Sequence, residues 1–196
     1  MRNSNNFMQA SDYEVYEQGK IISQWPRLKP RVGLIVKGTV SCYVQGTHHS
    51  RSGLSHFNFA DDWLGLEHMP WIGSGRKAIV WKAETKCLVS FFPLAKVLEM
   101  LETSLGPSMY RSMMLSMSRQ TGQVFDGLMA HTLSDQERFE KALARLAEVL
   151  GEPTEQGTLV RKISKVEIAK LTGVSREYAS RQMKRSEEHT SELQSH

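Results

Sequence analysis

Between Tyr13 and Pro93 the apolar residues fall into short runs that are separated by turn residues. The segment VGLIVKGTVSCYVQG holds two β-branched runs divided at Gly38, and AIVWKAETKCLVSFF holds two more around Glu84. Short runs at regular spacing, bounded by glycine and other turn residues, are typical of antiparallel strands. We therefore expect an antiparallel β-roll, or jelly roll, rather than a fold in which strands and helices alternate.

After Pro93 the period becomes helical: PLAKVLEMLETS predicts a short helix, and residues 106–132 predict a long one. The long segment carries two apolar seams. One runs through Met109, Met113, Met117, Gln120, Val124, Leu128 and His131, and the other through Tyr110, Met114, Thr121, Phe125 and Met129. One face of a helix cannot bury both seams.

This long helix is either enclosed in a monomeric core, or it packs on its own roll while its second seam meets the same helix of another subunit. The sequence predicts no other long helix that could enclose it, which favours a homodimer. The residues that we assign to the dimer interface are Met109, Met113, Met117, Val124 and Leu128.

Two helical patterns follow the long helix. In SDQE the residues Ser134 and Glu137 have the spacing of a capping box, and the helix that they open should end near Gly151. A loop-rich stretch, EPTEQGT, then leads to a short strand, LVRKIS. Together these patterns give an α+β fold.

The segment SKVEIAKLTGVSREYASRQMKR predicts two short helices that are joined at Gly173, with Ser175 as the N-cap of the second helix. The apolar residues expected in their shared core are Ile168, Leu171, Val174 and Ala179. This is the geometry of a helix-turn-helix, whose second helix enters the major groove of DNA. Helical hairpins with glycine turns also occur in bundles that do not bind DNA.

Charge supports the DNA interpretation. The formal net charge is only +4, but seven basic and two acidic residues lie between Arg161 and Lys184, and a concentrated positive segment favours a polyanionic partner. Arginine can donate two parallel hydrogen bonds to guanine, and glutamate can accept one from cytosine. The candidate base-reading residues are Arg176, Glu177 and Arg181, and the candidate phosphate contacts are Lys162, Lys165, Lys170, Ser175 and Lys184.

Other features exclude some classes of protein. No run of eighteen apolar residues and no secretion signal is present, so we expect a cytoplasmic protein with no membrane partner. Cys42 and Cys87 lie far apart in strand-like runs, and we expect buried free thiols rather than a disulfide or zinc framework.

The order of these parts resembles the Crp/Fnr family of bacterial transcription regulators over residues 13–184. The resembling segments are LIVKGTV, ADDWLGLE, GSGRKAIVWKAETKCLVSFFPL, SDQERFEKALARLA and IAKLTGVSREYASRQMKR. The resemblance implies a sensory β-roll, a dimerisation helix and a winged helix-turn-helix. It also implies a homodimeric, non-enzymatic regulator that binds operator DNA and RNA polymerase. Arg176, Glu177 and Arg181 match the family's base-reading positions, whereas Gln182 replaces an apolar core residue.

The resemblance divides the chain into an effector domain (1–104), a dimerisation helix (105–132), a DNA-binding domain without its wing (133–184) and a tail (185–196). The tail, RSEEHTSELQSH, has no apolar pattern. Its first eleven residues match the in-frame translation of a common sequencing-library adapter. We therefore expect the tail to be an artefact that replaces the natural end of the protein.

The effector stays unidentified at this point. In cyclic-nucleotide binders of the family, a Gly-Glu pair holds the ribose and an Arg-Ser or Arg-Thr pair holds the phosphate. The residues at or beside these positions, which we take as the effector pocket, are Gly65, Leu66, Glu67, Arg76 and Lys77. Because the ribose-binding carboxylate is displaced, we do not expect a cyclic nucleotide. The oxygen-sensing iron–sulfur cluster of the Fnr branch needs four thiolates, and two cysteines cannot supply them within one chain.

Two alternatives stay open. A metal-dependent enzyme of the cupin type would want two histidines one residue apart on a strand, but His48 and His49 are adjacent and point to opposite sides. Separately from these alternatives, the sensory half could bind haem through His48, His49, His56 or His68. The second alternative is a ligand-sensing module with no role at DNA.

Overall fold

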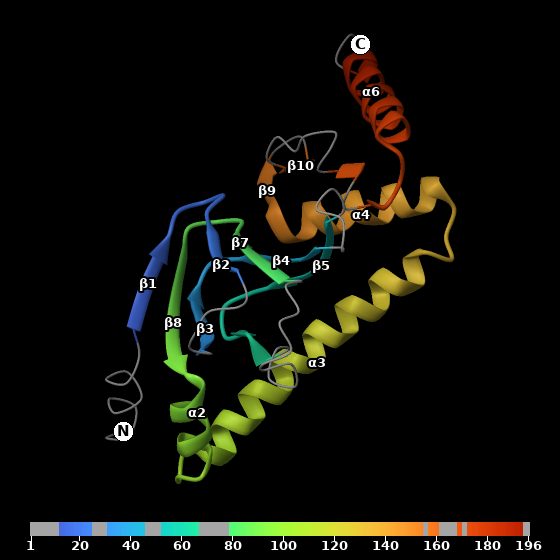
Figure 1. Cartoon of the computed structure of the whole chain (residues 1–196). Helices are drawn as coiled ribbons and strands as arrows, with labels where there is room; N and C mark the ends of the chain where they lie inside the picture. The colour runs from blue at the N-terminus through green and yellow to red at the C-terminus, as the bar shows by residue number, and fades with distance from the viewer. Residues whose placement is uncertain are drawn as a thin grey trace. The chain divides into compact units, whose positions relative to one another are not determined.

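A computed structural model describes residues 12–24, 31–45, 52–66, 79–154, 157–160, 168–169 and 172–193 (Figure 1). The chain forms two compact units. The first consists of Met1–Ser50 with Leu54–Asp126, and the second consists of Arg51–Gly53 with Gly127–His196. The four-part division expected from the sequence stays a prediction.

The first unit is a roll of two four-stranded sheets. One sheet has the order β1 (Asp12–Tyr16), β8 (Cys87–Pro93), β3 (Arg31–Lys37) and β6 (Trp63–Leu64). The other has the order β2 (Ile21–Gln24), β7 (Ile79–Ala83), β4 (Val40–Gln45) and β5 (Ser52–Asn58). The strand registers in the described part of the roll are antiparallel. The expected α+β class with an antiparallel roll is confirmed.

The core of the roll forms where the inward residues of both sheets meet. Its buried members are Ile22, Ile35, Val40, Cys42, Leu64, Trp81, Ala83, Cys87, Val89 and Phe91. Gly38 allows the turn between β3 and β4, because its φ is +102° and a Cβ there would lie 2.6 Å from the Cys87 Sγ. Cys42 and Cys87 are buried free thiols, as expected.

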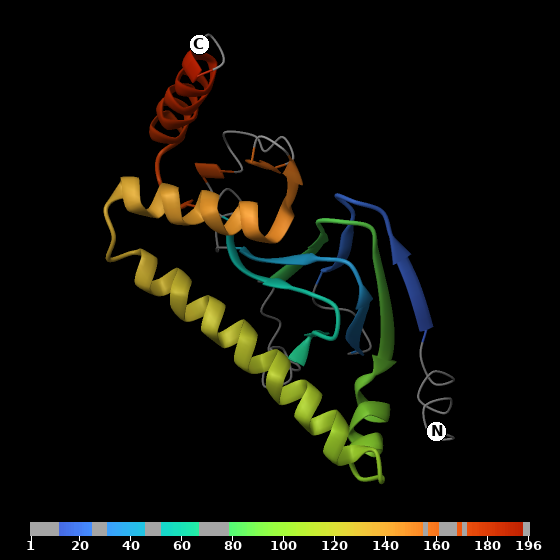
Figure 2. The ribbon, with the colours of Figure 1, turned by 180° about the vertical axis from the view of Figure 1, so that it is seen from behind.

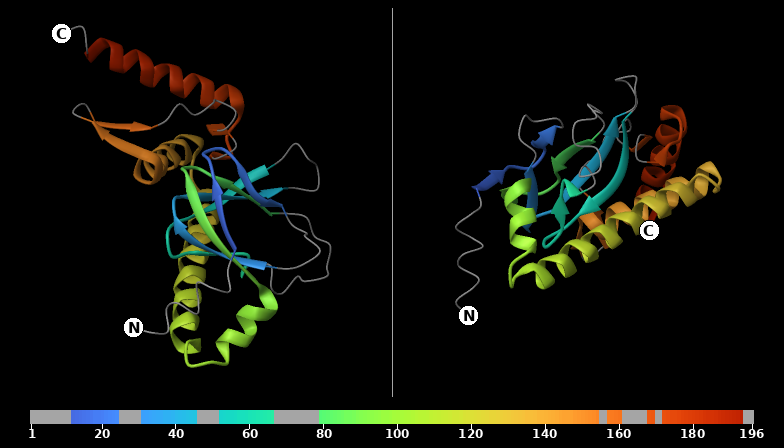
Figure 3. Two further views of the ribbon diagram at one scale, coloured as in Figure 1. Left: turned by 90° about the vertical axis from the view of Figure 1, so that its left-hand side faces the viewer. Right: turned by 60° about the horizontal axis from the view of Figure 1, so that its bottom comes forward.

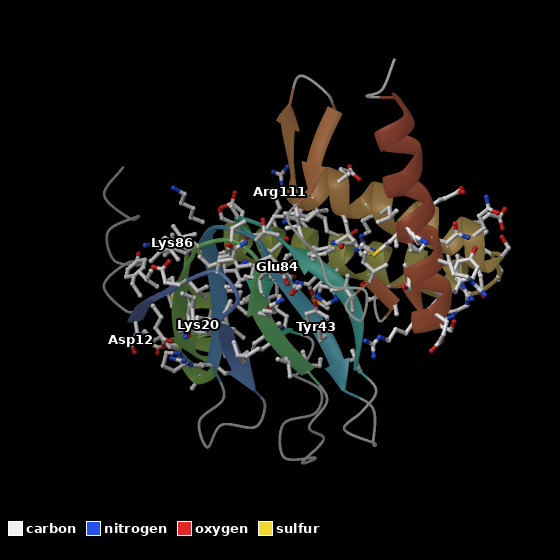
Figure 4. The ribbon with its side chains drawn as sticks, turned by 90° about the horizontal axis from the view of Figure 1, so that it is seen from above. Asp12, Lys20, Tyr43, Glu84, Lys86 and Arg111 are labelled. Atoms are coloured by element: carbon white, nitrogen blue, oxygen red, sulfur yellow. The ribbon has the colours of Figure 1, made fainter. Side chains whose placement is uncertain are left out.

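The roll also holds a buried carboxylate. Glu84, which Figure 4 shows beside strands β4 and β7, accepts a hydrogen bond of 2.7 Å from the Ser41 Oγ. Its Oε1 lies 3.4 Å from the Nζ of Lys82. Because both partners belong to neighbouring strands, this network ties β4 to β7 at the end of the sheet.

Two helices follow the roll. Helix α2 (Leu94–Leu101) follows the end of β8, and the long helix α3 (Gly106–Ala130) begins beside it and runs along the roll (Figures 2 and 3). They form a second core with the outer face of the first sheet, and its buried members are Val32, Trp63, Leu66, Phe92, Leu94, Val97, Met100, Met109 and Met113. The bounds of α3 confirm the long helix that the sequence predicts.

The second unit contains α4 (Asp135–Leu150), a two-stranded hairpin and α6 (Arg176–Leu193). The capping box is confirmed, because Ser134 Oγ accepts from the Glu137 N–H and the Glu137 side chain accepts from the Ser134 N–H. The hairpin pairs β9 (Gly151–Thr154) with β10 (Gly157–Val160). The sequence suggested a loop at β9 because of Pro153, but each strand of an isolated hairpin is an edge, where proline is tolerated.

Helix α6 extends beyond the two short helices expected from the sequence and ends at Leu193. It therefore runs through most of the tail. The origin of residues 185–196 stays a prediction. Among the described residues, no helix is long and apolar enough to cross a bilayer.

Candidate nucleic-acid interface and helix seam

The turn before α6 is built as the sequence predicts. Gly173 has a φ of +68°, and its N–H donates a hydrogen bond of 3.0 Å to the carbonyl of Ala169. The hydroxyl of Thr172, which is buried, donates to the carbonyl of Ile168 at 2.9 Å. Together the left-handed glycine and the buried hydroxyl close the end of the first helix and redirect the chain.

Helix α6 begins with the predicted cap. The Oγ of Ser175 accepts a hydrogen bond of 3.1 Å from the Tyr178 N–H, and the Ser175 carbonyl accepts from the Ala179 N–H at 3.0 Å. The ring of Tyr178 meets the ring of Phe139 in α4 edge-on, with centroids 6.4 Å apart. The start of α6 is therefore anchored both by its own cap and by α4.

The core expected for the helix-turn-helix is confirmed where the structure describes it. Ile168, Val174 and Ala179 are buried. Leu171 lies outside the described residues. Gln182, which departs from the family pattern, is half-buried.

The three candidate base-reading residues project from this anchored helix. Arg176, Glu177 and Arg181 are exposed. None of them forms a hydrogen bond or ion pair with the described part of the chain. Glu177 and Arg181 are one helical turn apart and so lie on one face. Lys184 is also exposed. The other predicted phosphate contacts, Lys162, Lys165 and Lys170, lie outside the described residues.

Two of the five predicted effector residues can be placed. Gly65 has a φ of +93°, which strains any other residue, and a Cβ on it would lie a tight 3.2 Å from the Arg31 carbonyl oxygen. Leu66 is packed in the second core. Glu67, Arg76 and Lys77 lie outside the described residues.

Of the histidines considered as haem ligands, His56 is buried, and its Nδ1 lies 3.0 Å from the Ser55 Oγ. The remaining candidates, His48, His49 and His68, lie outside the described residues.

Helix α3 faces the roll with a polar stripe that sequence reasoning missed. Ser116 Oγ accepts a hydrogen bond of 2.9 Å from the Trp63 N–H, and Ser112 Oγ accepts one of 2.9 Å from the Trp63 indole. The side chain of Gln120 donates to the Trp63 carbonyl at 2.8 Å and to the Asn58 side-chain oxygen at 2.9 Å. The polar residues of this stripe are Ser112, Ser116, Arg119, Gln120 and Gln123.

The same stripe also contacts β5 and the residue before β6. The amide of Gln123 accepts from the Phe57 N–H at 2.9 Å and donates to the Phe57 carbonyl at 2.8 Å, so it completes both backbone groups of one β5 residue. Arg119 forms an ion pair with the buried carboxylate of Asp62. A stripe of serine and glutamine gives no hydrophobic signal, which is why the sequence did not reveal this contact.

The placement of α3 changes the predicted dimer interface. Met109 and Met113 are buried in the second core of their own chain. Their assignment to a second subunit is therefore not supported, because their side chains are already covered. The other three residues, Met117, Val124 and Leu128, are exposed.

An apolar stripe on α3 is left exposed by this docking. Tyr110 is 55% exposed and Leu128 is 58% exposed, and the positions between them follow a heptad spacing of four and three, with Thr121 at one of them. We call these residues the outer seam: Tyr110, Met114, Met117, Thr121, Val124 and Leu128. The signal was present in the sequence, but Tyr110, Met114 and Thr121 were placed in the other seam.

No family sequence model matches the chain, and comparison with curated protein sequences gives no match. Solved structures do match. A regulator from Xanthomonas campestris, described as the c-di-GMP-responsive global regulator CLP, shares 19% identity and a TM-score of 0.76 with it. The match covers 95% of this chain and 91% of that one. The chain has the Crp/Fnr fold.

Two regulators from Thermus thermophilus share this Crp/Fnr fold. One, described as of the CRP family, has 18% identity and a TM-score of 0.71, with 90% of this chain and 85% of that chain covered. The other, described as of the CRP/FNR family, has 15% identity and a TM-score of 0.67, with 87% and 82% covered. All three of these neighbours are described as regulators.

Proposed function

We propose that the chain is a sequence-specific, DNA-binding transcription regulator of the Crp/Fnr type. The observation that carries this proposal is the presentation of Arg176, Glu177 and Arg181, exposed and without partners among the described residues, on a helix anchored at Ser175 and Tyr178. Side chains held in this way are available to base edges in the major groove. The fold of the neighbouring regulators supports the same function.

The proposed residues have two roles. Arg176, Glu177 and Arg181 read bases, and each well-made contact discriminates by about 1–3 kcal/mol. The candidate phosphate contacts set affinity and salt dependence without reading sequence, and they are Lys162, Lys165, Lys170, Ser175 and Lys184.

The roles are tested by comparing Arg176→Ala with Lys170→Ala. Operators are first selected from random duplexes, and affinities for the selected and scrambled duplexes are then measured by fluorescence anisotropy at several salt concentrations. Arg176→Ala should remove the preference for the operator. Lys170→Ala should weaken both duplexes alike and reduce the salt slope by about one. The role assignment fails if both variants lose affinity equally for every duplex.

The active species is proposed to be a homodimer that associates through the outer seam. A heptad spacing over residues 110–128 and the exposure of Tyr110, Met114 and Leu128 support a parallel helix pair. Two recognition helices would then bind half-sites about 34 Å apart on a palindromic operator.

A signal at the roll would control this dimer, which would contact RNA polymerase in the cytoplasm. Gly65 and Leu66 would adjoin the effector pocket, with Glu67, Arg76 and Lys77 as its polar residues. The Xanthomonas campestris regulator is described as c-di-GMP-responsive. The cupin-type enzyme and the module without a DNA role are not favoured, since the structural neighbours are described as regulators.

A further inference from the structure

Arg31, the first residue of β3, directs its side chain into the roll. Gly33 and Ile35, which follow at alternate positions of the strand, are buried, and alternate residues share one face of a sheet. The guanidinium carbon of Arg31 lies 3.9 Å from the centroid of the Phe91 ring, which belongs to the core of the roll. The side chain of Arg31 is 20% exposed.

One end of this guanidinium has a partner. Its Nη1 donates to the Glu14 Oε1 at 2.5 Å, and the hydroxyl of Tyr16 donates to the other oxygen of Glu14. Glu14 and Tyr16 both belong to β1. This chain of contacts, together with the Phe91 ring, fixes the plane and the rotation of the guanidinium.

The opposite edge of the Arg31 guanidinium has no hydrogen-bond partner among the described residues. The Nε and Nη2 atoms of Arg31 are buried, and neither has a hydrogen-bond partner among the residues that the structure describes. These two N–H groups lie on one edge of the guanidinium, where they point in parallel and match the two oxygens of a carboxylate or phosphate. Arginine cannot relieve the deficit by losing its proton, and native proteins rarely leave such donors unsatisfied.

The position of Arg31 agrees with a ligand-binding role. β3 pairs with β6 through Gly33 and Leu64, and the missing side chain of Gly65 leaves its backbone close to the Arg31 carbonyl. Arg31 therefore adjoins the segment that begins the predicted effector pocket. The resemblance to the Crp/Fnr family did not single out this residue.

We propose that the Nε–Nη2 edge of Arg31 binds an oxyanion, the carboxylate or phosphate group of a small molecule. Glu14 holds the guanidinium in place from the other side. That this ligand is the effector rests on the proposed function, whereas the binding itself does not. The site and the DNA-reading residues are consequently tested by separate measurements.

The binding test uses the full chain without DNA. Thermal unfolding is followed while inorganic phosphate, succinate or cyclic di-GMP is added at constant ionic strength, with sodium chloride as the reference. A ligand that binds the folded state raises the melting temperature in a saturable way. We expect saturation with at least one probe, and the probe that acts distinguishes phosphate from carboxylate ligands.

Two variants then identify the group that binds. Arg31→Lys keeps the charge and loses the two-donor edge, so its dissociation constant should rise by about tenfold or more. The matched control is Arg111→Lys on the exposed surface of α3, which should bind as the wild type does. Glu14→Gln should tighten binding, because the amide oxygen can still accept the hydrogen bond that orients Arg31 while the competing negative charge is removed.

The proposal is overturned if no probe stabilises the protein beyond chloride, or if Arg31→Lys binds as tightly as the wild type. If Arg31→Lys does not fold, Glu14→Gln decides: tighter binding supports the site, and unchanged or weaker binding rejects it. If anions bind as expected but the operator is not recognised, the ligand site stands and the proposed function fails. If the operator is recognised and no anion binds, the proposed function stands and the ligand site fails.

Discussion

The side-chain amide of Gln123 acts as a one-residue strand partner for β5, since it satisfies both backbone groups of Phe57. We predict that Gln123→Leu, which keeps the size and removes both bonds, lowers the free energy of unfolding by about 1–3 kcal/mol. Urea denaturation followed by tryptophan fluorescence measures this effect.

The control for Gln123→Leu is Gln136→Leu on the exposed surface of α4. Because surface changes of this kind usually alter stability by less than about 0.5 kcal/mol, its midpoint should match that of the wild type. Equal midpoints for both variants would show that the Phe57 bonds contribute nothing to stability.

The thiols give a second prediction for single residues. Burial raises the pKa of the Cys87 thiol, which donates to the carbonyls of Thr39 and Thr85, and Cys42 is fully buried. A thiol whose pKa is raised in the folded state is less ionised than in the unfolded chain. Its contribution to stability is therefore complete below the ordinary thiol pKa and is lost as the pH rises through the raised pKa.

We accordingly expect neither cysteine of the native protein to react with Ellman's reagent at mildly alkaline pH, because only an accessible thiolate attacks it. Both should react at once in urea. Rapid release of one equivalent of product per native chain would contradict this expectation.

At the scale of elements, α3 contains a glycine that its packing does not require. A Cβ added to Gly122 would have no atom within 4 Å. We predict that Gly122→Ala stabilises the protein by about 0.5–1 kcal/mol, because alanine loses less conformational entropy in a helix. A shift of the thermal unfolding midpoint reports the change.

Gly33→Ala serves as the contrasting variant. A Cβ at Gly33 would lie 2.8 Å from the Phe91 ring, so the same chemical change should destabilise the roll. If both variants raised the thermal unfolding midpoint, the lower backbone entropy of alanine, rather than the space around each glycine, would decide the stability.

Local signals explain which elements the sequence could predict. Gly173, Ser175 and the Ser134–Glu137 pair act within one turn of chain, so their spacing alone defined the turn, the cap and the capping box. The β9 strand was missed since Pro153 is an obstacle only inside a larger sheet. The roles of Arg176, Glu177 and Arg181 at DNA stay predictions.

The faces of α3 could not be assigned by the same means. Periodicity shows that a helix has two apolar seams, but it does not show which one its own roll covers. Met109 and Met113 were separated from Met117, Val124 and Leu128, which the sequence placed in the same seam, only by contacts with residues distant in sequence, such as Trp63. The backbone partners of Ser116 and Gln123 are equally distant in sequence. The pattern of hydrophobic residues therefore could not predict these hydrogen bonds.

For the whole molecule, the outer seam predicts a dimer. Leu128→Asp should convert the protein to a folded monomer, because a charge would have to be buried between two helices while the side chain is exposed within one chain. Sedimentation velocity at several concentrations measures the assembly, and circular dichroism measures the fold.

The control for the seam is Ser108→Asp, an exposed position of α3 that lies off the seam. It should leave the dimer intact, and an acidic residue in the first turn of a helix is favourable. A wild-type chain that is monomeric at micromolar concentrations, or a Leu128→Asp variant that remains dimeric, would reject this interface.

The polar stripe of α3 has a consequence for how much active protein a cell holds. Because α3 attaches to its roll through Met109, Met113 and the polar stripe, the chain completes its tertiary structure without using the outer seam. Folding and pairing are then two independent equilibria. If two chains pair through the outer seam as proposed, the paired fraction rises with abundance, and the synthesis rate would then be an input to the proposed regulator, alongside any small molecule.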